Sequence, residues 1–181
     1  KPYIAVQNPT HYGVFLIKTP WVISDAAASW NWDGMEGKPA IVEVYAQGDE
    51  VELLLNGTSL GKKAAGKEAG FRTLFETTYE PGILTAISYE NGHEIGRNEL
   101  ATAGCERTLC VEKEEYVGLK NAKQELVYVQ VEMRDQNGVL AADDTQKITL
   151  SVDGEVEVLG FGSGNPKPNY NFNEGVTELF G

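Results

Sequence analysis

The chain has 181 residues, of which 41% are hydrophobic, enough to bury the core of one large or two small domains. Its formal net charge is −12, so it lacks the cationic face that nucleic acids and anionic membranes require, and neither is expected as a partner. No apolar run approaches the ~20 residues that span a bilayer. Because the chain opens on Lys1 rather than Met, we interpret it as a piece of a longer protein.

The first elements in chain order are short apolar runs at residues 3–6 and 14–17. They could be short strands, but they do not fit clearly into the pattern that follows, so we expect residues 1–18 to be the tail of a preceding domain or a linker. Residues 42–60 (VEVYAQGDEVELLLNGTSL) then predict two strands and the start of a third. The turn Asn56-Gly57 is typical of a tight hairpin, because both residues accept the positive φ of a type I′ turn.

Strand-length runs separated by turn signals continue to the end of the chain. In residues 127–133 the apolar side chains alternate with polar ones, which is typical of a sheet with one buried face. A second series of strands is expected at residues 109–111, 126–134, 147–152 and 156–161. The fold class is therefore predicted as all-β, with two tandem immunoglobulin-like antiparallel β-sandwich modules at residues 19–103 and 104–181.

The two cysteines, Cys105 and Cys110, lie five residues apart. On an extended chain they would be ~16 Å apart, whereas a disulfide needs Cα atoms within ~7 Å. We therefore expect free thiols. Two cysteines without nearby partners make no zinc site, and His11 and His93 are distant in sequence.

Four oxygen-bearing side chains lie close together in the second half of the chain. Calcium binds such oxygens, but Asp and Asn also form turns by bonding their own backbone, and we favour turns. No metal and no cofactor are predicted. These four residues are Asp135, Asn137, Asp143 and Asp144.

Trp21, Trp30 and Trp32 lie within twelve residues of one another. Sugar rings stack on exposed aromatic faces, so the three are candidate carbohydrate-binding residues; the favoured alternative is that they are packing anchors. Asp33 and Glu36 beside them are the one carboxylate cluster that suggests a glycosidase pair. With 27 acidic residues, close pairs arise by chance, so no catalytic residue is predicted.

Several motifs of the chain resemble the C-terminal region of bacterial family 2 glycoside hydrolases, the β-galactosidase group. In the second module, residues 128–135 (YVQVEMRD) and 158–166 (VLGFGSGNP) are similar to the immunoglobulin-like domain that ends many of these enzymes. The motifs of the first module are SWNWDGMEGK at residues 29–38, VEVY at 42–45, VELLLNGTSLG at 51–61, YEPGILTA at 79–86 and LATAG at 100–104.

This resemblance implies a non-catalytic fragment whose parent hydrolyses terminal β-galactosides or related β-glycosides. Its expected partner is the catalytic barrel domain of the same polypeptide, which carries both catalytic glutamates, with carbohydrate as a second candidate. The family's last domain runs on into a final strand, so the second sandwich is expected to lack its last strand. A carbohydrate-binding module and an adhesin-like immunoglobulin segment are the alternatives, and the compartment stays open.

Overall fold

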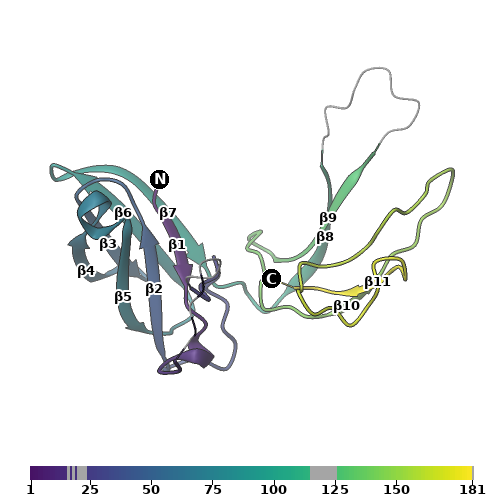
Figure 1. Ribbon diagram of the computed structural model, residues 1–181, viewed down its shortest axis with the longest axis horizontal. Helices are drawn as coiled ribbons and strands as arrows, with labels where there is room; N and C mark the ends of the chain where they lie inside the picture. The colour runs from purple at the N-terminus through teal and green to yellow at the C-terminus, as the bar shows by residue number, and fades with distance from the viewer. Residues whose placement is uncertain (16, 18, 20–23, 115–125, 181) are drawn as a thin grey trace, which may run out of the picture. The chain divides into compact units, whose positions relative to one another are not determined.

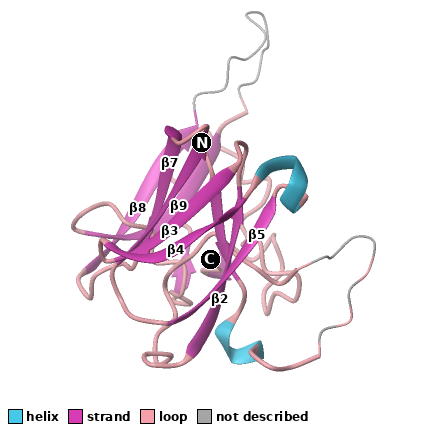
Figure 2. Cartoon of the chain, turned by 90° about the vertical axis from the view of Figure 1, so that its left-hand side faces the viewer, coloured by secondary structure: helices cyan, strands magenta, loops and turns pink. Residues whose placement is uncertain are grey.

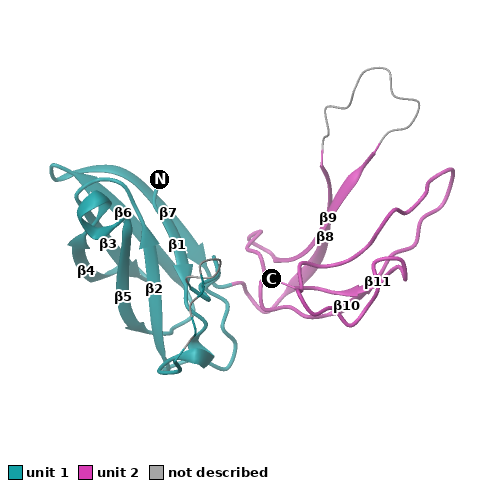
Figure 3. Cartoon of the chain, in the orientation of Figure 1, with its two compact units in different colours: residues 1–102 teal, residues 103–181 magenta. Residues whose placement is uncertain are grey.

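The computed structural model describes residues 1–15, 17, 19, 24–114 and 126–180. Within them, regular structure is β-strand apart from two short 3-10 turns, Pro9–His11 and Gly66–Ala69 (Figure 2). The all-β class is therefore confirmed. The helical segments of the described chain include none with the length and apolarity to cross a bilayer. The chain divides into two compact units, Lys1–Thr102 and Ala103–Gly181 (Figure 3).

The first unit contains two antiparallel sheets that pack face to face around one core (Figure 1). One sheet has the order β1-β2-β5, formed by Tyr3–Val6, Pro39–Tyr45 and Arg72–Thr78. The other has the order β4-β3-β6-β7, formed by Thr58–Ala64, Glu50–Leu55, Ile83–Glu90 and His93–Ala101.

Period-two patterning explains this core. Val42 and Val44 of β2 face Val51 and Leu53 of β3 across the layer between the sheets, and all four are fully buried. Successive residues of a strand point to opposite faces, so the intervening positions lie outside the core layer. Burying each such side chain contributes about 1.5–3 kcal/mol, so this layer dominates the stability of the unit.

The hairpin expected around Asn56-Gly57 is confirmed. Asn56 and Gly57 have φ values of 51° and 78°, and Leu55 pairs with Thr58 across the turn. Residues 3–6 differ from expectation, because they form β1, which pairs with β2 in the register Tyr3↔Tyr45. They belong to the first sheet rather than to a tail, since Ile4 and Val6 supply fully buried core side chains.

The described residues of the second unit form two small antiparallel sheets. Arg107–Glu114 (β8) pairs with Tyr128–Asp135 (β9), and Lys147–Thr149 (β10) pairs with Val176–Glu178 (β11). The strand expected at residues 156–161 is not formed: Phe161 N donates to Phe172 O, but no ladder follows. Extended backbone counts as a strand only when a neighbour pairs with it.

The core of the second unit is correspondingly small. Its buried members are Ala103, Met133 and Ala141, with Val139 and Leu179 packed against them. Many apolar side chains of this unit stay exposed, such as Val111, Val156 and Leu159.

Candidate functional site

Trp30 is a packing anchor in the core of the first unit. Its ring is fully buried and meets Tyr79 edge to face, with the ring centroids 4.8 Å apart. Its Nε1 donates to Glu80 O at 3.0 Å, and its own carbonyl accepts from Thr102 Oγ1 at 2.7 Å. Both faces of the indole are covered, so Trp30 offers no platform for a sugar ring.

Trp32 is only partly buried and packs against the edge of the same core. Its backbone N–H donates to Tyr79 Oη at 3.2 Å, and its carbonyl accepts from Met35 N, which closes a tight turn. The Nε1 atom of Trp32 is buried without a hydrogen-bond partner. Trp21, the third candidate, lies outside the described residues.

Asp33 and Glu36 are exposed on this turn. A glycosidase holds its two carboxyl groups at a fixed separation on rigid elements. An exposed turn does not fix side chains in this way, so the structure gives this pair no catalytic geometry.

Among the described residues, the most strongly held carboxylate is that of Glu43 on β2. Its side chain is fully buried and accepts hydrogen bonds from Arg72, Gln7, Ser24 and Tyr45. Burial alone raises the pKa of Glu43, but the hydrogen bonds, above all from Arg72, outweigh it and lower the pKa to about 2. Every acceptor site is engaged within the protein, so Glu43 is structural and has no lone pair directed at a ligand.

The acidic residues among the calcium candidates of the second unit contact protein donors, although Asp143 Oδ1 is buried without a hydrogen-bond partner. Asp135 accepts from the backbone N–H groups of Gly104, Asn137 and Val139, which lower its pKa. Arg107 lies 3.1 Å from Asp143 Oδ2 and 3.6 Å from an oxygen of Asp144. In the part of the chain that is described, no group of three or more His, Cys, Asp or Glu side chains is arranged to hold a metal ion.

Cys105 and Cys110 are free, as predicted; Cys105 is exposed.

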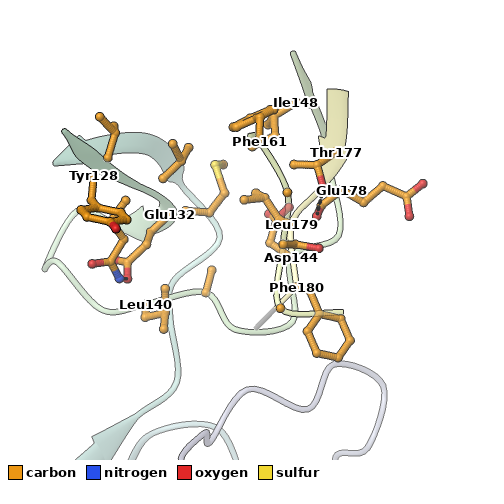
Figure 4. A pocket seen from close by; sticks show the side chains of 18 of the residues that line it. Tyr128, Glu132, Leu140, Asp144, Ile148, Phe161, Thr177, Glu178, Leu179 and Phe180 are labelled. Carbon is orange, nitrogen blue, oxygen red and sulfur yellow. Dashed lines mark hydrogen bonds between the residues drawn. The ribbon is translucent and has the colours of Figure 1, made fainter. Parts of the chain in front are cut away.

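A groove of about 420 Å³ lies in the second unit, along β9. Figure 4 shows Tyr128 and Glu132 on one side of it, with Phe161, Thr177 and Leu179 opposite. We call it the β9 groove. Sequence reasoning missed it, because it depends on which strands pair rather than on any motif; the alternating valines of β9 were its signal in the sequence.

Two family profiles match the chain. Residues 37–96 match the "Domain of unknown function (DUF4982)", and residues 113–181 match the "Glycoside hydrolase family 2 C-terminal domain 5". The chain belongs to the C-terminal region of family 2 glycoside hydrolases. This family 2 region is 28% identical over 155 residues to "Beta-galactosidase BoGH2A" of Bacteroides ovatus. The aligned residues cover 83% of the chain and 17% of that relative.

Solved structures agree with this assignment. The structure of a family 2 glycosyl hydrolase member from Bacteroides cellulosilyticus superposes on the chain with a TM-score of 0.81 at 30% identity. The match covers 99% of the chain described here and 24% of the Bacteroides cellulosilyticus chain. A family 2 beta-glucuronidase shares the fold over 70% of the chain, at 16% identity and a TM-score of 0.58. The family 2 region described here therefore spans about a sixth of the curated relative and a quarter of the Bacteroides cellulosilyticus chain.

Proposed function

We propose that the chain is a pair of non-catalytic, immunoglobulin-like accessory modules. They act within a glycosidase that hydrolyses terminal β-galactosides or related β-glycosides with its other domains. The observation that carries this proposal is the match of residues 113–181 to a family 2 C-terminal domain. The β-galactoside preference rests on the likeness to the Bacteroides ovatus protein.

The hydrogen bonding and exposure of the carboxylates support a non-catalytic role. Glu43 and Asp135 are tied to protein donors, whereas Asp33 and Glu36 lie exposed on a turn. Hydrolysis with retention needs two carboxyl groups ~5 Å apart, one as acid and one as nucleophile. A carboxylate saturated by internal hydrogen bonds can play neither part.

The test is a pair of assays with chromogenic β-galactoside and β-glucuronide. The 181-residue chain is expected to release no chromophore above buffer, and a longer polypeptide that contains it is expected to cleave the galactoside faster. Turnover by the chain alone, abolished by Glu36→Gln, would overturn the non-catalytic role. Preference of the longer polypeptide for the glucuronide would overturn the substrate class.

A second candidate function is carbohydrate binding by Trp32, with Trp21 as a further candidate from the sequence; the buried Trp30 takes no part in it. Trp32 is the member that favours it, because its indole is partly exposed. Indole faces stack on sugar rings. Titration with galactose-containing oligosaccharides should then give a saturable fluorescence change that Trp32→Ala removes and Trp30→Phe retains. A flat titration of the wild-type chain counts against this function.

A further inference from the structure

Two Asn-Gly pairs of the first unit form the same kind of turn. Asn56-Gly57 joins β3 to β4, and Asn91-Gly92 joins β6 to β7, each as a two-residue loop between directly paired residues. Both asparagines have a φ of 51° and are exposed, and the glycines have φ values of 78° and 77°. The two pairs are therefore matched in backbone conformation. The third pair lies in a different turn, because Asn137 does not have a positive φ.

An asparagine followed by glycine can lose its side-chain amide without an enzyme. The glycine nitrogen attacks Cγ of the asparagine, so that a new N–Cγ bond closes a five-membered succinimide and the Cγ–Nδ2 bond breaks. Nδ2 leaves as ammonia with the proton of the glycine N–H, and water then opens the ring at either carbonyl to give aspartate or isoaspartate. Glycine has no Cβ to obstruct the approach. The rate therefore depends on how freely the asparagine side chain can turn toward the glycine nitrogen.

The side chain of Asn56 is held in place by the residues that lead into β6. Its Oδ1 accepts from Ile83 N at 2.9 Å, and its Nδ2 donates to Pro81 O at 3.3 Å. Gly82 lies so close that a Cβ there would be 1.8 Å from Asn56 Oδ1. Turning the amide toward Gly57 must break both hydrogen bonds, which slows the attack.

The side chain of Asn91 has no such restraint. Its backbone N–H donates to Asp49 Oδ2 at 2.8 Å, but in the described part of the chain its side-chain amide makes no hydrogen bond. The amide can therefore turn toward Gly92 without losing a partner within the described protein. The matched backbones leave side-chain anchoring as the difference between the two turns.

We infer that Asn91 is a site of spontaneous deamidation through a succinimide with Gly92, and that Asn56 is protected from the same reaction by its two hydrogen bonds. The product places a new carboxylate near Asp49, and like charges repel. Isoaspartate also adds a methylene group to the backbone of a two-residue loop. Both changes weaken the contact between this hairpin and the turn that contains Asp49. This inference does not depend on the proposed function.

The experiment incubates the 181-residue chain in mildly alkaline buffer and follows both turns by mass spectrometry, with fragmentation that distinguishes isoaspartate from aspartate. Trypsin separates the two turns into different peptides. The peptide with Asn91 is expected to deamidate at least about tenfold faster than that with Asn56, and to yield both isomers. Equal rates, a faster reaction at Asn56, or aspartate as the sole product at position 91 would each overturn the inference.

The same incubation in guanidinium chloride is the control for the effect of the fold. Unfolding releases the side chain of Asn56 from Ile83 and Pro81, so the two rates should become similar. An unchanged ratio of the rates in the unfolded chain would mean that the neighbouring residues determine them, which overturns the inference.

The variant Ile83→Pro tests the protection of Asn56 directly. It removes the N–H that donates to Asn56 Oδ1, and Ile83 is the first residue of β6, a strand position that tolerates proline. Deamidation at Asn56 should become faster while the rate at Asn91 stays the same. An unchanged rate at Asn56 in the folded variant contradicts the inference. If the variant does not fold, the comparison of the folded and unfolded wild-type chain decides.

Discussion

Arg72 donates two hydrogen bonds to Glu43, from Nε at 2.8 Å and from Nη2 at 2.6 Å. The pair joins β5 to β2, and Glu43 also accepts from Ser24 and Gln7, which lie before β2 in the chain. Because Glu43 is fully buried, this contact holds the outer side of the β1-β2-β5 sheet together. Removing the cation would leave a buried carboxylate without its main partner.

We expect Arg72→Met to lower the free energy of unfolding by about 3–5 kcal/mol, the usual result of breaking a buried ion pair from one side. Urea unfolding followed by circular dichroism measures this change. The control is Arg97→Met, because Arg97 and its partner Glu94 are both exposed. Exposed pairs contribute about 0–1 kcal/mol, so equal losses in the two variants would contradict the structural role of Arg72.

The lowered pKa of Glu43 predicts acid sensitivity of the first unit. The unfolded chain takes up this proton near pH 4.5, whereas the folded protein resists it until about pH 2. Stability from this group is complete above pH 4.5 and is lost as the pH falls toward 2, by a total of about 3 kcal/mol. Urea titrations across this range should show the loss in the wild type and a much smaller one in Glu43→Gln. Parallel curves for the two proteins would disprove the assignment.

Two tryptophans that are two residues apart in sequence should differ in their contribution to stability. Trp30→Phe removes the hydrogen bond to Glu80 O and leaves a gap beside Tyr79, so it should cost about 2–4 kcal/mol. Trp32→Phe loses no hydrogen bond from Nε1 and should cost below about 1.5 kcal/mol. Thermal and urea unfolding compare the variants, and a larger cost for Trp32→Phe would refute this ranking.

Gly48, in the turn between β2 and β3, should be harder to replace than Gly57, in the turn between β3 and β4. Its φ is 91°, and a Cβ there would lie 2.1 Å from the backbone oxygen of Tyr89. Gly48→Ala is expected to destabilise the first unit by more than about 2 kcal/mol, from strain and backbone displacement together. At Gly57 φ is also positive but no atom lies within 4 Å, so Gly57→Ala should cost about 1 kcal/mol. Equal unfolding midpoints for the two variants would contradict this account.

The strands of the first unit could be predicted because local signals and packing agree there. Asn56-Gly57 determines its hairpin by turn chemistry, and the alternating residues 42–45 and 51–55 determine which face is buried. Strand β1 could not be assigned in the same way. Its four residues become a strand only through pairing with β2, a contact that no local pattern encodes.

The candidate site was harder to predict for the same reason. Trp30 and Trp32 have the same residue type and similar neighbours, yet one lies between the sheets and the other at their margin. Glu43 occupies a non-core position of β2, where sequence alone favours solvent; its burial depends on Gln7 and Ser24 from outside the strand. The burial of these side chains is determined by tertiary contacts, which cannot be predicted from sequence periodicity or composition.

The division of the chain at Thr102 also separates its chromophores. All three tryptophans fall in the first unit, whereas the second contains tyrosines and no tryptophan. Selective excitation of indole therefore follows the loosening of Lys1–Thr102 alone, and a probe of overall β content follows both parts. Coincident melting curves from the two signals would mark a single cooperative transition, and separated curves would mark two.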